Sequence, residues 1–300
     1  MLDFLQTDPI AFKIPIGDGF PIFWYGIIVT VGIALGAWWA GREIEKRRQN
    51  VDELYNGLII VIFSGYIFAR LTYVVLDIVG GRGGQYTSLA DVLNIRAGGV
   101  NILGGFVGAA LLGLAYVRWR RLKFWHYADV AGPALLLGQA IGRWGNLINQ
   151  ELYGPPTDLP WGLLISPAYR LPQYSDLTVY PPETRFHPTF LYESLALLVG
   201  FVLLAWLNGR YREQWKPGTL FGLFMIWWGG NRAWIELFRP DQPTIGDSFV
   251  TYSMLVSIGI ALAGVWVLLA RYGKLPESDK KKRRRRRRAL KPKPRRDRAG

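Results

Sequence analysis

Residues 54–79 read LYNGLIIVIFSGYIFARLTYVVLDIV, and Arg70 and Asp77 are the two charged side chains in this stretch. Because an α-helix rises about 1.5 Å per residue, about 20 apolar residues cross the ~30 Å hydrocarbon core of a bilayer. The stretch is therefore predicted to be a membrane-spanning helix. Six further blocks have the same character. The seven predicted spans are Phe20–Ala40, Leu54–Val79, Val100–Val117, Ala128–Gly145, Phe190–Leu207, Leu220–Leu237 and Phe249–Ala270.

Basic residues gather in alternate loops between the predicted spans. They follow the first, third, fifth and seventh spans, whereas the other loops are poor in Lys and Arg for their length. Since cytoplasmic loops are enriched in these residues, the pattern predicts an outer N-terminus and a cytoplasmic C-terminus. Three aspartates and one lysine precede the first span, so it lacks a basic n-region and is expected to be retained and not cleaved as a signal peptide. The predicted fold class is an all-α polytopic membrane protein with seven transmembrane helices.

The longest predicted loop, residues 146–188, would lie on the outer side of the membrane and is rich in proline. Because proline lacks a backbone N–H and disrupts helix interiors, this loop is predicted to form an irregular or short-stranded outer cap. Residues 1–270 are thus expected to form one seven-span membrane domain that carries the cap.

A basic, low-complexity segment occupies residues 271–300 and holds 16 of the 36 Lys and Arg residues and 3 of the 22 acidic residues. The other residues are almost neutral as a group. The segment is predicted to be a disordered cytoplasmic tail whose charge also attracts anionic membrane lipids. Because the excess charge belongs to the tail, no nucleic-acid partner is expected.

Cysteine is absent from the chain, and His126 and His187 are its two histidines. The absence of cysteine excludes disulfides, thiolate metal sites and a cysteine nucleophile on this chain. Two histidines argue against a zinc site. We therefore expect no metal.

Charged side chains inside the predicted spans are the main indication of a functional site. A charge near the bilayer centre costs roughly 2.5–3.5 kcal/mol on insertion scales, so such residues usually pair with one another or line a cavity. In the predicted topology they all fall in the outer half of the membrane or just above it, together with Tyr25. They are Arg70, Arg143, Glu193, Arg232 and Glu236, with Glu151 and Arg239 just beyond the ends of spans.

This set contains more arginine than glutamate. Arginine stays charged and binds phosphate through two parallel hydrogen bonds, so the excess predicts an outward-facing site for a phospholipid head group. Arg232, Glu236 and Arg239 have the spacing i, i+4, i+7 and are expected on one helix face. For Arg232 and Glu236 alone, a stabilising ion pair is the simpler interpretation.

Three polar segments carry a family resemblance. They are GRWGNLINQELYGPPT at residues 142–157, HPTFLYE at residues 187–193 and NRAWIELFRPD at residues 231–241. Together with FP at residues 20–21 and WYG at residues 24–26, they resemble the signatures of bacterial prolipoprotein diacylglyceryl transferases. The resemblance covers the seven predicted spans and leaves out the basic tail.

The resemblance implies an enzyme that transfers the diacylglyceryl group of phosphatidylglycerol to the lipobox cysteine thiol of a preprolipoprotein signal peptide. The product is a thioether, and glycerol phosphate is released. The nucleophile then belongs to the substrate, which agrees with a chain that has no cysteine. The resemblance also implies a bacterial plasma-membrane location, an active site facing the outer side, and a reaction without a metal or organic cofactor.

By the same resemblance, Arg143 and Arg239 are expected to bind the lipid phosphate. Glu151 would orient Arg143 or accept the thiol proton, and Asn146 would hydrogen-bond the head group or a loop carbonyl. The other catalytic or supporting candidates are Tyr25, Arg232, Glu236 and His187.

The clearest departure from the family pattern is Leu103, which stands where the family usually has a histidine. Leucine cannot accept a proton, so a catalytically inactive homologue that binds phospholipid or lipoprotein is the alternative hypothesis. A transporter is a third hypothesis, although the repeat-related, discontinuous helices of many transporters are not evident. The following Gly104 and Gly108 have the spacing of a close helix-packing motif.

Overall fold

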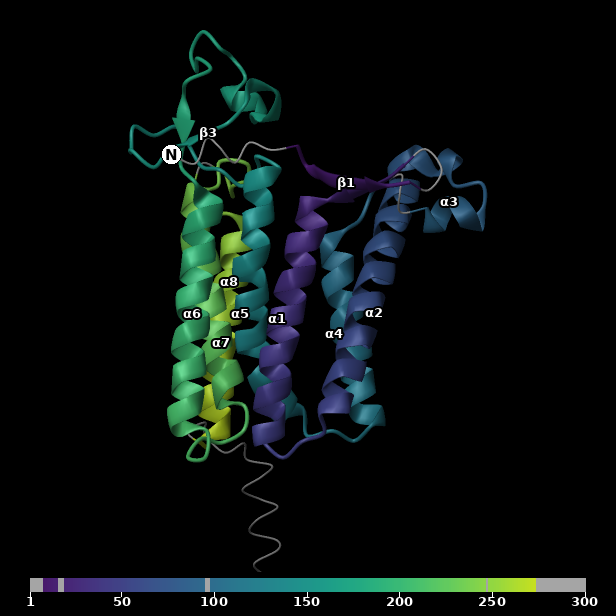
Figure 1. Cartoon of the computed structure of the whole chain (residues 1–300), viewed down its shortest axis with the longest axis vertical. Helices are drawn as coiled ribbons and strands as arrows, with labels where there is room; N and C mark the ends of the chain where they lie inside the picture. The colour runs from purple at the N-terminus through teal and green to yellow at the C-terminus, as the bar shows by residue number, and fades with distance from the viewer. Residues whose placement is uncertain (1–7, 16–18, 95–97, 247, 274–300) are drawn as a thin grey trace, which may run out of the picture.

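The computed structural model describes residues 8–15, 19–94, 98–246 and 248–273. Each of the seven predicted apolar blocks contains one long helix, and these helices run side by side (Figure 1). They are α1 (Trp24–Lys46), α2 (Val51–Asp77), α4 (Ile102–Trp119), α5 (Phe124–Ile148), α6 (Thr189–Tyr211), α7 (Thr219–Ile235) and α8 (Tyr252–Arg271). The predicted tail from residue 274 onward lies outside the described residues.

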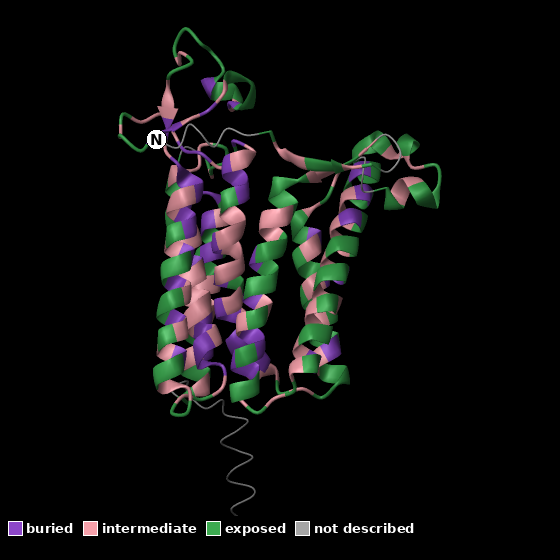
Figure 2. Ribbon diagram, in the orientation of Figure 1, coloured by how far each residue is buried: buried purple, intermediate pink, exposed green. Residues whose placement is uncertain are grey.

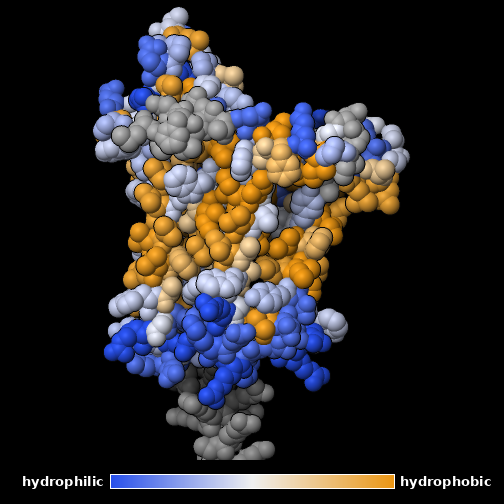
Figure 3. All heavy atoms as spheres, viewed as in Figure 1, coloured by the Kyte–Doolittle hydropathy of each residue, from blue (hydrophilic) through white to orange (hydrophobic). Residues whose placement is uncertain are grey.

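The surface of the helices is apolar. Five of them, α1, α2, α4, α6 and α8, are long and apolar enough to cross a membrane. On the face seen in Figure 3, hydrophobic residues cover the middle of the molecule, and hydrophilic residues gather at both ends. Large apolar side chains such as Phe63, Phe106 and Trp206 are exposed. Because a soluble protein rarely exposes so much apolar surface, this chain is a multi-pass membrane protein.

The long helices form a bundle and an arm. In the bundle, α1 packs chiefly against α5, and α5 also contacts α6 and α7, while α7 pairs with α8. The arm consists of α2 and α4, which pack chiefly against each other and stand beside α1 (Figure 1). Buried residues concentrate in the bundle, whereas the arm is largely exposed (Figure 2). The arm therefore contacts the bundle chiefly through α1.

Two glycines bring the helices of the arm together. A Cβ added to Gly104 would lie 2.1 Å from Oγ1 of Thr72, and one added to Gly108 would lie 2.3 Å from Cβ of Phe68. Neither position has room for a side chain, so the close packing predicted from the glycine spacing is confirmed.

Replacing Gly108 with valine is expected to destabilise the protein, because the new side chain would overlap Phe68. Overpacking of this kind typically costs about 1–3 kcal/mol. The measurement is unfolding of the purified variant in detergent. Gly259→Ala on α8 is the control, since a Cβ there meets nothing within 4 Å. Equal unfolding midpoints for the two variants would contradict the close approach of α2 and α4.

The start of the first predicted span is wrong. Residues 20–23 form strand β2 (Phe20–Phe23), which pairs antiparallel with β1 (Ile10–Ile14), and the helix begins only at Trp24. Pro21 explains the difference, because proline fixes its own φ and holds the preceding residue in an extended conformation. The sixth long helix ends earlier than the predicted end of its span at Leu237. Helix α7 ends at Ile235, and a 3-10 turn, η6 (Glu236–Phe238), follows.

The loop that follows α2 has some structure of its own. It contains a π-helical turn η2 (Ile78–Arg82), a 3-10 turn η3 (Gly83–Gln85) and the short helix α3 (Leu89–Leu93). Arg70, only 4% exposed, donates hydrogen bonds from α2 to the carbonyl oxygens of Val92 and Gly99. Its guanidinium thereby holds this loop to the arm.

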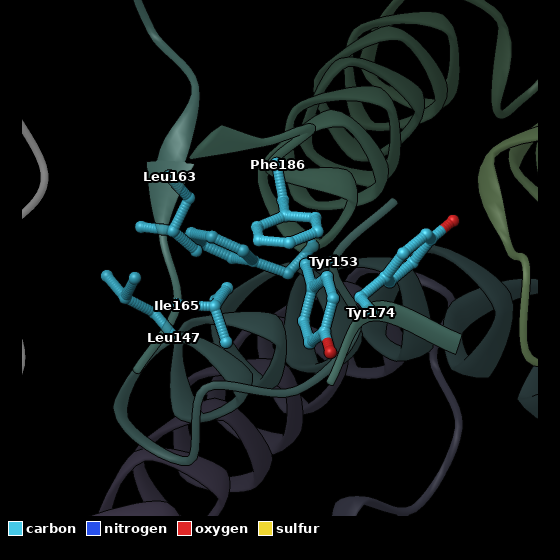
Figure 4. Close-up of a cluster of buried hydrophobic side chains, with 7 residues drawn as sticks. Leu147, Tyr153, Leu163, Ile165, Tyr174 and Phe186 are labelled. Atoms are coloured by element: carbon cyan, nitrogen blue, oxygen red, sulfur yellow. The ribbon is translucent and has the colours of Figure 1, made fainter. Parts of the chain in front are cut away.

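Between α5 and α6 the chain forms a cap with little regular structure. It contains β3 (Leu163–Leu164), which pairs antiparallel with β4 (Arg185–Phe186), and the 3-10 turns η4 (Pro167–Tyr169) and η5 (Pro172–Tyr174). Its buried side chains meet the end of α5 and the start of α6 (Figure 4). This cluster contains Leu147, Tyr153, Leu163, Ile165, Tyr174, Phe186 and Phe190.

A buried polar cluster lies at the end of the bundle opposite the cap. Asp129 on α5 is 2% exposed and accepts hydrogen bonds from the backbone N–H groups of Gly218 (2.8 Å) and Phe221 (2.9 Å) at the start of α7. Arg47 pairs with Asp129 at 3.2 Å and donates to Oδ1 of Asn208 at 2.7 Å. The Asp129 carboxylate therefore joins α5, α7 and the end of α1, a role that the sequence analysis missed.

Candidate functional site

Arg143 lies near the cap end of α5, in the last two turns of that helix. Its guanidinium pairs with Oε1 of Glu193 on α6 at 2.6 Å. The Glu193 side chain is 3% exposed and that of Arg143 is 25% exposed. Glu151 was expected to orient Arg143 or to accept the thiol proton. The carboxylate that pairs with Arg143 is that of Glu193, and Glu151 accepts hydrogen bonds from Asn146 and Asn149 instead. The reason is tertiary, since α5 and α6 pack together and bring residues that are 50 positions apart into contact.

Arg143 stands at one end of an apolar groove. The groove is a cavity of about 340 Å³ that follows α1 and α5. Tyr25 and Arg143 line one end, and Ala40 and Leu54 line the other. Between these ends the lining is almost entirely glycine and apolar side chains. The site thus combines a fixed positive charge with a long apolar surface.

Tyr25 reaches this site because of a glycine on α5. A Cβ on Gly145 would lie 2.5 Å from Cδ2 of the Tyr25 ring, so the absence of a side chain there lets the ring lie against the helix. Tyr25 and Arg143 therefore come from α1 and α5 to the same end of the groove, as predicted for one polar layer.

A second cavity, of about 420 Å³, lies under the cap. Its lining includes Asn149, Glu151, Arg239 and Asp241. Glu151 accepts hydrogen bonds from Nδ2 of Asn146 (2.9 Å) and from Nδ2 of Asn149 (3.1 Å). Asn146 is 4% exposed and follows Arg143 by three residues on α5. It therefore bonds the carboxylate of Glu151 from a position on α5 one turn beyond Arg143.

Arg232, Glu236 and Arg239 do not share one helix face. Arg232 pairs with Glu236 at 2.8 Å, and this part of the prediction is confirmed. Arg239 lies beyond the helix, because α7 ends at Ile235, and it pairs with Asp241 at 2.8 Å. Burial raises the pKa of the Asp241 carboxyl, but the hydrogen bonds and positive charge of Arg239 outweigh it, so this pKa lies below its ordinary value. Arg239 thus faces the cavity with its charge partly balanced.

The charged groups of the site interact with one another. Arg232 lies within electrostatic reach of Arg143, Arg239, Glu193 and Glu236. Within the described residues, several buried polar atoms here have no hydrogen-bond partner, namely Nε of Arg143, Oδ1 of Asn146 and Oε2 of Glu193. Because buried polar groups in native proteins are normally paired, these atoms mark a polar region at the cap end of α5 and the start of α6.

His187 lies beside this site and lines neither cavity. Its Nδ1 is 3.1 Å from the hydroxyl of Tyr192, which accepts a hydrogen bond from Nε1 of Trp161 at 3.0 Å. Burial lowers the pKa of the His187 imidazole, which favours its neutral form. The ring also packs against Phe238. These contacts fit a residue that holds the cap to the start of α6.

Two residues singled out in the sequence lie elsewhere. Arg70 holds the loop after α2 through hydrogen bonds to backbone carbonyls. Its guanidinium is occupied there, so Arg70 is not one of the candidate phosphate-binding arginines. Leu103 is 70% exposed on α4 in the arm and lines neither cavity. Across the residues that the structure describes, no group of three His, Asp or Glu side chains is arranged to hold a metal.

The fold and the site together define a class of protein. A multi-pass membrane protein with one arginine at the end of an apolar groove and another in the neighbouring cavity has the features needed to hold an anionic lipid, the head group at the charges and a chain in the groove. Residues 9–270 match the family described as prolipoprotein diacylglyceryl transferase, and the chain belongs to this family.

Curated relatives agree with this family. The chain is 40% identical over 267 residues to the phosphatidylglycerol–prolipoprotein diacylglyceryl transferase of Chloroflexus aggregans, with 84% of this chain and 86% of the relative covered. It is 34% identical over 278 residues to proteins of the same name from Bacillus mycoides and Bacillus cereus, with 92% of this chain and 96% of each relative covered. The similarity therefore includes the arm, the bundle and the cap.

Proposed function

We propose that this protein transfers the diacylglyceryl group of phosphatidylglycerol to the lipobox cysteine thiol of a preprolipoprotein signal peptide. The observation that carries the proposal is Arg143, held by Glu193 at the mouth of the apolar groove. A phospholipid has the same order of parts, since an anionic phosphate is followed by apolar acyl chains. The family membership and the names of the relatives support the same reaction.

In the proposed reaction, the thiolate sulfur forms a bond to the glyceryl carbon that carries the phosphate. The carbon–oxygen bond to the phosphate breaks, and its electron pair leaves with glycerol phosphate, while the thiol proton passes to a base or to solvent. Charge develops on the leaving phosphate, so fixed guanidinium groups stabilise the transition state more than the ground state. The chain's own contribution is to position the lipid and to stabilise this charge.

The individual residues have separate proposed roles. Arg143 binds the phosphate from the groove side, and Arg239 binds it from the cavity under the cap. Glu151 and Asn146, which are hydrogen-bonded to each other, orient the head group. The supporting roles fall to Tyr25 at the groove mouth, the Arg232–Glu236 pair beneath the site, and His187 in the cap.

We also propose how the protein sits in the membrane. All seven long helices span it, the cap faces outward, and the N-terminus lies outside while the basic tail lies in the cytoplasm. The alternation of basic loops supports this orientation. In a bacterial plasma membrane it places the proposed site on the side where preprolipoproteins emerge. The division into a membrane domain of residues 1–270 and a tail of residues 271–300 belongs to the same proposal.

The inactive-homologue hypothesis is not supported. The relatives are named as the transferase, and the match to them covers most of their length. Leu103 is directed to the surface of the arm and touches neither cavity, so the proposed site is complete without it. We expect the unmodified protein to transfer the diacylglyceryl group, and we expect Leu103→His to change the rate by less than about threefold.

The test mixes purified protein with phosphatidylglycerol and a lipobox peptide and follows the mass gain of the peptide. Replacing the peptide cysteine with serine is the substrate control, because no thioether can then form. Transfer by Leu103→His alone, with none by the unmodified protein, would overturn the proposal in favour of a binding protein that has lost its catalytic group.

A further inference from the structure

Gln139 is a polar side chain in the otherwise apolar part of the groove. It lies on α5 four residues before Arg143, so it is on the same helix face and about 6 Å deeper in the membrane. An amide that lines an apolar cavity needs hydrogen-bond partners, because an unpaired buried polar group is costly.

Trp228 fixes the orientation of this amide. Nε1 of Trp228 on α7 donates a hydrogen bond to Oε1 of Gln139 at 2.9 Å. The indole N–H is a donor and has no acceptor, so the side that faces Trp228 must be the carbonyl oxygen. The amide N–H groups are consequently left to face the groove. At this depth the Gln139 amide can donate a hydrogen bond, so a ligand that binds there needs an acceptor.

We propose that Gln139 donates a hydrogen bond to an acyl ester carbonyl of the bound phospholipid and thereby selects ester-linked over ether-linked lipids. This inference rests on the proposed function, since it assumes a phospholipid with its phosphate at Arg143. In such a lipid the ester carbonyls lie between the phosphate and the hydrocarbon chains. They are acceptors without a donor of their own, which complements the amide N–H one helical turn below Arg143.

The size of the groove argues for a lipid chain rather than a peptide helix beside Gln139. The groove runs along α1 and α5 from Arg143 to Ala40, and its lining of glycine and apolar side chains suits an extended acyl chain. A helix about 10 Å in diameter does not fit in a cavity of about 340 Å³. The acceptor that meets Gln139 therefore belongs to the lipid.

The effect on specificity follows from the loss of one hydrogen bond. A site built to bond a polar group disfavours an analogue that lacks the group, because the site's own donor is left unpaired. We expect the protein to use diacyl phosphatidylglycerol about tenfold better than its dialkyl ether analogue, as judged by kcat/KM.

The experiment measures transfer to a lipobox peptide from the diacyl lipid and from the dialkyl ether lipid. Gln139→Leu should slow transfer from the diacyl lipid, which loses its hydrogen bond, and should not slow transfer from the ether lipid, so that the preference of about tenfold disappears. Trp228→Phe removes the N–H that orients the amide and should weaken the preference while keeping Gln139. The control is Gln214→Leu, the same substitution at an exposed position between α6 and α7.

Retention of the two lipids by the purified protein, measured by native mass spectrometry, separates this inference from the proposed function. Preferential retention of the diacyl lipid that Gln139→Leu abolishes, without transfer from either lipid, would overturn the proposed function and leave the role of Gln139 standing. Transfer from both lipids at equal rates would overturn the role of Gln139 and leave the function standing. If Gln139→Leu slowed transfer from both lipids equally, the amide would not select between them. Gln139 would then act only in packing, and its proposed role would be overturned.

Discussion

Arg143→Ala is expected to lower diacylglyceryl transfer by about 10²- to 10³-fold, the loss seen when one preorganised donor to a developing anion is removed. Arg143 lies at the head of the groove, and Glu193 holds its guanidinium at 2.6 Å. Alanine would leave the lipid phosphate without this partner in a place where little water can replace it. The measurement is kcat/KM for the lipobox peptide at a saturating level of phosphatidylglycerol.

Two further variants make the result specific. Arg143→Lys keeps the charge but loses the forked geometry, so it should recover only part of the activity. Arg118→Ala, near the end of α4 opposite the cap, is the matched control and should transfer normally. All variants should reach the membrane in similar amounts. Full activity of Arg143→Ala at a normal membrane level would rule out the phosphate role assigned to this residue.

Asp129→Ala is expected to destabilise the protein by about 3–5 kcal/mol, the range measured when one partner of a buried ion pair is removed. The substitution leaves Arg47 without its carboxylate and leaves the backbone N–H groups of Gly218 and Phe221 unpaired. Unfolding in detergent, followed by helical content, gives the loss. The effect is structural, because Asp129 lies at the opposite end of α5 from Arg143.

The exposed Glu213, in the turn between α6 and α7, provides the control. Glu213→Ala removes a carboxylate without a buried partner and should change stability by less than about 0.5 kcal/mol. The double variant Arg47→Ala/Asp129→Ala should be less unstable than the sum of the two single variants, since the pair is lost only once. Simple additivity would show that Arg47 and Asp129 do not depend on each other.

The sequence placed the candidate site residues in one region better than it paired them with one another. The motif at residues 142–157 led to Arg143, Asn146 and Glu151, and the structure brings all three to the end of α5. The motif did not predict that Glu193 is the partner of Arg143. A nearby glutamate in the same motif was the obvious choice, whereas the actual partner comes from another helix.

Arg70 and Arg239 illustrate the same limit. Depth in the membrane placed both in one polar layer, but depth does not say which direction a side chain faces. Arg70 belongs to the arm and binds backbone carbonyls there, while Arg239 lies past the end of α7 and lines the cavity under the cap. The packing of the helices decides the direction that each of these side chains faces.

What the sequence by itself determined is the set of long apolar helices and the family, because apolar length and motif spacing are properties of contiguous residues. The tertiary structure decided the separation of the arm from the bundle, the ion pair of Arg143 with Glu193, the bonds of Asp129 across three helices, and the groove that ends at Arg143. The physical reason is that a buried charge must find a partner in space. Helix packing sets which side chains are near enough, and a single apolar pattern is compatible with many packings.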